Sequence, residues 1–251
     1  MSPADALLLA GAAFAAGVLN AIAGGGSFLT FPALVFTGVP PIIANATSAL
    51  TVSPGYLGST LGMREELARV APQRLRAEAS IAAAGGVVGA LLLLITPASA
   101  FRAIVPWLLL FATVVFMAGP RCVRWLAQHR GGTPGRGARI WGLLAVSVYG
   151  GYFNGGLGIL LMALYTVTGE SRIHTANALK NLNSLVLSLL SVVTFALAGA
   201  IAWGPALLMM VVATAGGFVG ARGARRLPAS AVRAVVIGTG VVMSAVFFWR
   251  G

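Results

Sequence analysis

Residues 85–103 read GGVVGALLLLITPASAFRA, and residues 216–234 read GGFVGARGARRLPASAVRA. The two stretches align without a gap at an offset of 131 residues, and 11 of the 19 aligned positions are identical. The sequence on either side of both copies is almost uniformly apolar. An internally duplicated hydrophobic chain is typical of secondary transporters, so the repeat indicates a membrane fold built from two halves.

The composition also indicates an integral membrane protein. Hydrophobic residues make up 58% of the chain and charged residues only 9%, and the mean hydropathy is +0.92. This leaves too little polar surface to cover a soluble globule. We expect an all-α polytopic membrane protein with a single membrane domain over residues 1–251. Apolar tracts of a length that crosses a bilayer, about 17 to 25 residues, occur at 79–95, 101–119, 173–199, 204–221 and 231–249.

The strong positive charge has a membrane explanation. The formal net charge is +12, which in a soluble protein would suggest a nucleic-acid partner. Here the arginines stand in short connections between apolar tracts, where Lys and Arg set the orientation of a membrane protein. We therefore expect no nucleic-acid partner. The lone Cys122 excludes an intramolecular disulfide and a cysteine-based metal cluster.

The two copies of the repeat belong to two homologous halves. Repeat 1 covers about 4–119 and repeat 2 about 139–250, and an Arg-rich cytoplasmic loop at 120–138 joins them. Each half begins with an apolar stretch that is interrupted, in the first half by NAIAGGG at 20–26 and in the second by NGGLG at 154–158. A polar segment, a glycine-rich helix and a helix with the sequence Pro-Ala-Ser-Ala follow in each half.

The positive-inside rule separates two topologies. If each interrupted stretch crosses the membrane once, the halves are parallel, and Lys and Arg divide 10 to 7 between the two sides. If each stretch enters and returns as a re-entrant pair of short helices, the division becomes 15 to 2, with only Arg102 and Arg250 outside. We prefer the second topology, in which the halves are inverted repeats. The termini are then periplasmic or extracellular, and the Arg-rich loops are cytoplasmic.

The interruptions are candidate binding elements. Consecutive glycines weaken a helix, and irregular backbone persists at membrane depth only where protein or a water-filled cavity satisfies it. Helices that begin near Ser27 and Gly158 would direct their N-terminal amides, with their partial positive charge, at an anion. The alternative is tight helix packing through small residues.

Lys180 is the one charged residue that the sequence places deep in an apolar helix, at 173–199. It shares a polar stripe with Asn177, Asn181 and Ser184, because positions i, i+3, i+4 and i+7 lie on one helix face. An intramembrane lysine is a functional candidate. Alternatively, its amine reaches the cytoplasmic surface from the first turns of the helix.

The corresponding segment of the first half is polar but uncharged. Its Asn45, Thr47 and Ser48 either hydrogen-bond the same ligand or bond their own helix. His174, at the start of the Lys180 helix, either exchanges a proton near neutral pH or lies at the level of the lipid headgroups.

The acidic residues bear on coupling and catalysis. All five are expected at termini or in loops, so no intramembrane carboxylate is available as a proton relay. No catalytic or metal-binding constellation is visible, and we expect neither an enzyme nor a cofactor. The five are Asp5, Glu65, Glu66, Glu78 and Glu170.

At these motifs the chain resembles the sulfite exporter TauE/SafE family, also described as the toluenesulfonate uptake permease family. The resemblance covers nearly the whole chain and rests on NAIAGGGSFLTFPAL at 20–34, ANATS at 44–48, GGYFNGGLG at 150–158 and HTANALKN at 174–181. The second half departs from the family pattern, because it lacks the triple glycine and following proline often present there.

The resemblance implies export of a small sulfur-containing or organic anion, such as sulfite, sulfoacetate or another sulfonate, by alternating access across the inner membrane. An anion channel and a non-transporting membrane scaffold are the alternatives. The expected partners are the anion and the lipid bilayer, and a homodimer is compatible with the sequence. The predicted substrate-binding residues are Asn20, Gly24, Gly25, Gly26, Ser27, Asn45, Thr47, Ser48, Asn154, Gly155, Gly156, Gly158, Asn177, Lys180 and Asn181.

Overall fold

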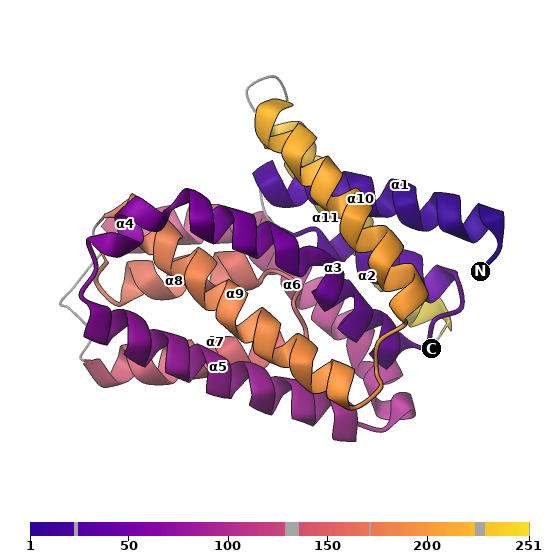
Figure 1. Cartoon of the computed structure of the whole chain (residues 1–251), viewed down its shortest axis with the longest axis horizontal. Coiled ribbons are helices and arrows are strands. Elements are labelled where there is room, and N and C mark those ends of the chain that lie inside the picture. Colours follow the sequence, from indigo (N-terminus) through magenta and orange to yellow (C-terminus); the bar gives the residue numbers. More distant parts are fainter. Residues whose placement is uncertain (23–24, 129–135, 171, 224–228, 251) are drawn as a thin grey trace.

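The computed structural model describes residues 1–22, 25–128, 136–170, 172–223 and 229–250. Within these ranges every regular element is a helix, which confirms the predicted all-α fold (Figure 1). The helices are α1 (Pro3–Ile22), α2 (Ser27–Phe36), α3 (Pro41–Gly62), α4 (Arg64–Ala68), α5 (Pro72–Ile95), α6 (Ala98–Gln128), α7 (Arg136–Tyr152), α8 (Leu157–Val167), α9 (Ile173–Leu197), α10 (Trp203–Gly223) and α11 (Ala229–Arg250).

Five helices of the described chain are long and apolar enough to cross a membrane, which makes this a multi-pass membrane protein. The helix α6 continues to Gln128 and so includes much of the segment 120–138 that we expected as a loop. The spans are Pro3–Ala21, Pro72–Ile95, Ala98–Gly119, Ile173–Leu197 and Trp203–Gly220.

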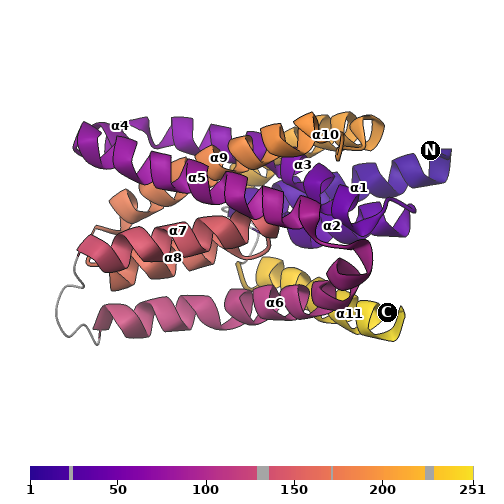
Figure 2. The same ribbon diagram turned by 90° about the horizontal axis from the view of Figure 1, so that it is seen from below.

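Both interrupted stretches fold back on themselves. α2 returns beside α1, and α8 returns beside α7 (Figures 1 and 2). The start of α7 and the end of α8 lie at the same end of the molecule, since Arg139 and Tyr165 both contact Glu78. Each stretch is therefore a hairpin of a longer and a shorter helix.

Glycines in left-handed conformation bound the short helices. Gly25 and Gly156 precede α2 and α8 with φ angles of 97° and 74°, and Gly38 and Gly169 follow them with 85° and 95°. Residues with a Cβ rarely adopt such angles. Within each pair the two glycines are 131 residues apart, which is the offset of the sequence repeat. The equivalence of the halves thus extends to backbone turns whose surrounding sequences differ.

The two halves interlock. The most extensive helix contacts are between α1 and α10 and between α5 and α7, so each half packs its first helix on the glycine-rich helix of the other half. A Cβ added to Gly89 would overlap the backbone of Val148, and one added to Gly220 would overlap the backbone of Val18. Small residues permit this close approach of helices. Neither half can complete its core alone.

The two glycine-rich helices run in opposite directions. α5 starts at the end of the molecule that carries α4, whereas α10 runs back toward that end (Figures 1 and 2). The ends of α3, α6 and α8 and the starts of α7 and α9 are gathered there, at the left of Figure 2. Arginines at or next to these helix ends, among them Arg64, Arg69, Arg139 and Arg172, consequently share one end, which we call the Arg-rich end.

Candidate functional site

A cavity of about 650 Å³ lies where the two interrupted stretches meet. It reaches from the breaks between α1 and α2 and between α7 and α8 toward the last turns of α6. Its lining residues are Asn20, Ala21, Gly25, Tyr56, Ser59, Phe116, Val123, Arg124, Asn154, Gly156, Leu157, Gly158, Ile159, Met162, Ile173, Asn177, Lys180, Asn181 and Ser184.

Eight of the predicted substrate-binding residues line this cavity. The helix period brings Asn177, Lys180 and Asn181 to one face of α9, and the chain breaks supply the other five. The eight are Asn20, Gly25, Asn154, Gly156, Gly158, Asn177, Lys180 and Asn181. Residues 134 apart in sequence, Asn20 and Asn154, are thereby joined in one polar wall.

The side chain of Lys180 crosses the first turn of α8. A Cβ added to Gly158 would lie 3.7 Å from Cδ of Lys180, an ordinary van der Waals distance, so the lysine stem lies close to the start of α8. The N-terminus of a helix carries partial positive charge. The ammonium group of Lys180 and the amides that begin α8 therefore act together on the same cavity.

The electrostatic character of the cavity is positive. Among its lining residues in the described chain, Arg124 and Lys180 are charged, and none is a carboxylate. A cleft lined by one sign of charge with low-dielectric walls concentrates ions of the opposite sign. The cavity is thus suited to an anion.

Two hydroxyl groups prepare the cavity for a polar ligand. The Oγ atom of Ser184 is buried and has no hydrogen-bond partner within the described part of the chain, although Ser184 lines the cavity. A buried unpaired hydroxyl is unfavourable unless a ligand or water satisfies it. The hydroxyl of Tyr56 donates to Oδ1 of Asn154 at 2.8 Å, which leaves the amide NH₂ of Asn154 for a ligand.

Tyr56, Ser59 and Arg124 are cavity residues that the sequence analysis missed. Arg124 was assigned to a loop because the apolar tract ends at 119, but α6 continues through it. Tyr56 belongs to a helix, α3, whose polar residues the sequence analysis considered only as far as Ser48. The phenol of Tyr56 and the guanidinium of Arg124, each flanked by apolar helix, were the signals in the sequence that could have identified these cavity residues.

The polar residues of the first half lie outside this cavity. Nδ2 of Asn45 donates to the Tyr152 carbonyl at 2.9 Å, and Oγ1 of Thr47 accepts from the Ala202 amide at 3.0 Å. The hydroxyl of Ser48 shares a 2.6 Å hydrogen bond with Thr30. These bonds fasten α3 to its neighbours.

Three further predicted residues, Gly26, Ser27 and Gly155, also do not line the cavity. A Cβ on Gly26 would press on the Ala16 carbonyl, and a Cβ on Gly155 would press on Phe153. Both glycines therefore serve close packing at the breaks. Gly24 lies outside the described residues.

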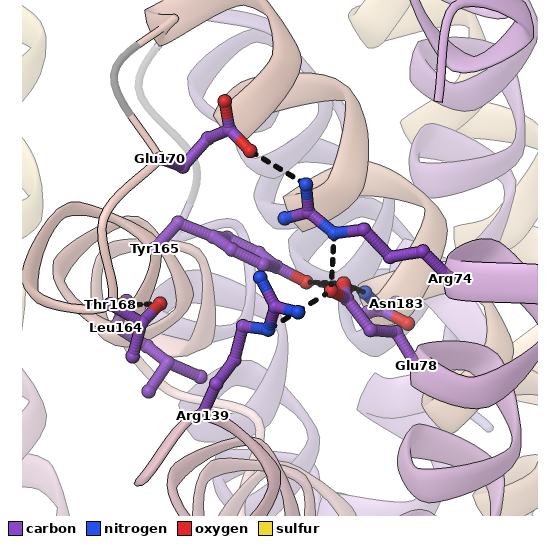
Figure 3. A network of polar contacts seen from close by, with 8 residues as sticks. All are labelled: Arg74, Glu78, Arg139, Leu164, Tyr165, Thr168, Glu170 and Asn183. Atoms are coloured by element: carbon purple, nitrogen blue, oxygen red, sulfur yellow. Dashed lines mark hydrogen bonds and ion pairs between the residues drawn. The ribbon is translucent and has the colours of Figure 1, made fainter. Parts of the chain in front are cut away.

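A buried ionic network lies next to the cavity, and Figure 3 shows its residues. Glu78 was expected in a loop, but this expectation was wrong, because it lies in the second turn of α5 with only 4% of its surface exposed. Its carboxylate accepts from Nε of Arg74 at 2.9 Å, the hydroxyl of Tyr165 at 2.8 Å and Nδ2 of Asn183 at 3.4 Å. Nε of Arg139 lies 3.6 Å away.

The network joins α5, α7, α8 and α9 at the Arg-rich end. Arg74 also bonds Glu170, in the connection from α8 to α9, at 2.8 Å. None of these residues lines the cavity. The network instead holds together the two helices that present Gly158 and Lys180.

A multi-pass helical membrane protein with interrupted helices around a polar, positively charged cavity belongs to the class of membrane transporters. A family model described as "Sulfite exporter TauE/SafE" matches residues 9–247. The chain therefore belongs to the TauE/SafE family, as its motifs predicted.

Curated relatives agree with this assignment. The chain is 29% identical over 252 residues to the probable membrane transporter protein YfcA of Escherichia coli K12, covering 93% of this chain and 86% of the relative. It is 30% identical over 232 residues to the probable membrane transporter protein ORF9 of a Sinorhizobium species, covering 90% and 85%. A probable membrane transporter protein of Haemophilus influenzae is 28% identical over 240 residues, covering 92% and 90%. No solved structure gives a significant match.

Proposed function

We propose that this protein is a secondary transporter that exports a small sulfur-containing or organic anion, such as sulfite or a sulfonate, through the cavity between the two chain breaks. The observation that carries the proposal is the charge of the cavity. Lys180 and Arg124 line it without any carboxylate among the described lining residues. A cation would find no complementary charge among the described lining residues.

The neutral groups of the cavity also suit a sulfonate or sulfite. Such anions accept hydrogen bonds through three oxygens, and hydrogen bonds to an ionised group are stronger than neutral ones. Asn20, Asn154 and Asn177 supply amide donors from three directions, and Ser184 supplies an unused hydroxyl. Lys180 and the first amides of α8 then compensate the charge.

We further propose that the halves are inverted repeats that work by alternating access. The opposite directions of α5 and α10, the reciprocal packing of α1 on α10 and of α7 on α5, and the paired left-handed glycines support this proposal. In such folds, rocking of one repeat against the other exposes a central site to each side in turn. The observed cavity reaches the Arg-rich end, at Arg124 and Ile173.

The direction of transport follows from charge and orientation. We place the Arg-rich end in the cytoplasm and the termini outside, because Lys and Arg accumulate on the cytoplasmic side of the inner membrane. A monovalent anion that leaves a cell with a negative interior gains about 2.3 kcal/mol per 100 mV. Export therefore needs no coupling ion.

The test is flux of radiolabelled sulfite and sulfoacetate in proteoliposomes under an imposed potential. Replacement of Lys180 by Gln removes a charge-assisted hydrogen bond and should raise the Kd about tenfold to a hundredfold. Lys180→Arg should retain much of the affinity. Arg76→Gln, an exposed charge change on α5, is the matched control and should leave the affinity unchanged.

Four outcomes oppose the proposal. Unchanged affinity in Lys180→Gln would place the lysine outside the site. Flux that ignores the imposed potential would rule out electrogenic export. Flux that does not saturate with anion concentration would favour a channel, and absence of any flux or binding would favour a membrane scaffold.

A further inference from the structure

A second, smaller pocket lies at the end of the molecule opposite the Arg-rich end. Its volume is about 370 Å³, and it lies between the connection from α2 to α3, the first turns of α6 and the last turns of α11. Arg102 is the one charged residue among its lining residues in the described chain, and Arg102 forms no salt bridge with any residue described there. The remaining walls, which include Val39 and Met243, are apolar.

A continuous series of aromatic contacts runs from this pocket to the edge of the cavity. Phe247 lines the pocket and stacks on Phe31, with ring centroids 5.8 Å apart. The ring of Phe31 meets that of Phe153 edge-on at 5.9 Å, and Phe153 precedes the cavity residue Asn154. We call Phe31, Phe153 and Phe247 the aromatic seal. Phe31 and Phe153 are buried, and an anion would lose its hydration in crossing between them.

The repeat relates the seal to the cavity. Phe247 and Phe116 are 131 residues apart, and Phe116 lines the cavity while Phe247 lines the outer pocket. Phe116 and Phe247 therefore occupy equivalent positions in the two halves, Phe116 at the cavity and Phe247 at the outer pocket. In alternating access, the outer compartment must open as the inner one closes.

The helix that carries the central ring of the seal has a hinge at each end. Phe31 stands in the middle of α2, a helix of ten residues, and the left-handed Gly25 and Gly38 bound it. A short helix between two such turns can rotate with changes confined to a few backbone angles. Rotation of α2 would unstack Phe31 from Phe247 and connect the two compartments.

We propose that the pocket around Arg102 is the outer anion site of the transport path, and that rotation of α2 opens the aromatic seal between it and the cavity. This proposal rests on the proposed function and extends it to a second binding residue. Arg102 receives the anion after it leaves Lys180, and a single exposed cation in an apolar pocket holds it weakly enough for release.

Cysteine labelling tests the outer site. The single native cysteine is first removed by Cys122→Ser, and Val39→Cys then places a thiol in the pocket. In cells, an anionic methanethiosulfonate bearing a sulfonate should label this thiol about tenfold faster than its cationic ammonium analogue, because Arg102 attracts it. Arg102→Gln should abolish the preference. Equal labelling rates for both reagents, or a preference that survives Arg102→Gln, would overturn the site.

The seal is tested with a thiol in the cavity. Met162→Cys should be unreactive toward the anionic reagent added outside, and Phe247→Ala should make it reactive. The matched control is Phe248→Ala, which removes the neighbouring ring that packs on Trp107 at 5.0 Å and takes no part in the seal. Phe31→Leu is the second seal variant, for use if Phe247→Ala fails to accumulate. If the thiol of Met162→Cys remains unreactive toward the anionic reagent in both seal variants, the proposed gate is wrong.

The two proposals fail in distinguishable ways. Lys180→Gln should raise the anion concentration that gives half-maximal flux but leave the labelling preference at Val39→Cys intact, since that preference depends on Arg102. Loss of the proposed function would appear as absent saturable flux in the unaltered protein. Failure of the outer site would appear as normal flux with no charge preference in labelling.

Discussion

Replacement of Glu78 by Ala should destabilise the protein more than any change of an exposed charge. The substitution removes the acceptor of Arg74, Tyr165 and Asn183 and leaves their buried donors without a partner for those bonds. Truncating one partner of a buried ion pair costs about 3 to 5 kcal/mol when the remaining charge is left uncompensated, and the lower value of about 3 kcal/mol applies here because Arg74 keeps Glu170 as a partner at 2.8 Å. We expect a loss of about that size in the free energy of unfolding.

The control for this prediction is a carboxylate that pairs with an arginine at the surface. Glu66 pairs with Arg69 at 2.8 Å, a distance close to that between Arg74 and Glu78, but the Arg69 side chain is 61% exposed. Exposed pairs contribute about 0 to 1 kcal/mol. Glu66→Ala should therefore change stability by no more than that amount.

Denaturant unfolding of the purified protein in detergent, followed by tryptophan fluorescence, compares the two variants. Glu78→Gln serves as an intermediate, because it keeps the shape and one acceptor oxygen but removes the charge. The reasoning is refuted if Glu78→Ala and Glu66→Ala unfold within about 1 kcal/mol of each other. In that case the donors of the network would find other partners or water.

The remaining predictions concern packing and the cavity wall. Gly86→Ala should destabilise the protein by about 1 to 3 kcal/mol through overpacking, since its Cβ would collide with the backbone of Leu187. Gly58→Ala has open space around its Cβ and should stabilise α3 by a fraction of 1 kcal/mol. Thermal unfolding compares the two variants. Asn45→Ala should lose about 1 kcal/mol of stability and leave anion affinity unchanged in a binding titration, and a changed affinity would place Asn45 in the site. Tyr56→Phe should weaken anion binding about twofold to tenfold, because it frees the Asn154 amide to rotate, and an unaltered Kd would contradict that role.

Much of the fold could be predicted because the membrane makes helix length and composition decisive. The apolar tracts at 79–95 and 173–199 correspond to α5 and α9, and the residues at 20–26 and 154–158 do interrupt helices. Helix ends were less predictable. The hydropathy of the sequence predicted that the first of these helices begins at Ala79, but it begins at Pro72. Proline is favoured in the first turn of a helix, and the polar residues that follow Pro72 pair with one another.

The candidate site was partly predictable for a related reason. A periodic stripe on one helix can be read from sequence, and α9 presents Asn177, Lys180 and Asn181 to the cavity as the period requires. Whether a polar residue faces a cavity or a neighbouring helix depends on packing between distant segments. Asn45 bonds a carbonyl 107 residues away, and no local pattern contains that information.

The repeat relates the backbones of the two halves but not their chemistry. The offset of 131 pairs Glu78 with Met209 and Tyr165 with Leu34, and all four are buried. Stability alone does not account for an ionic network at one end, since apolar side chains of similar volume often stabilise a core as well or better. The network includes Tyr165 of α8 and Asn183 of α9, the helices that carry the helix start at the cavity and Lys180, whereas the apolar equivalents are Leu34 of α2 and Met209 of α10. The charged half of the proposed site thus has ionic support, whereas α2 is tied to α3 by the 2.6 Å hydrogen bond between Thr30 and Ser48, which rotation of α2 between its glycines has to break.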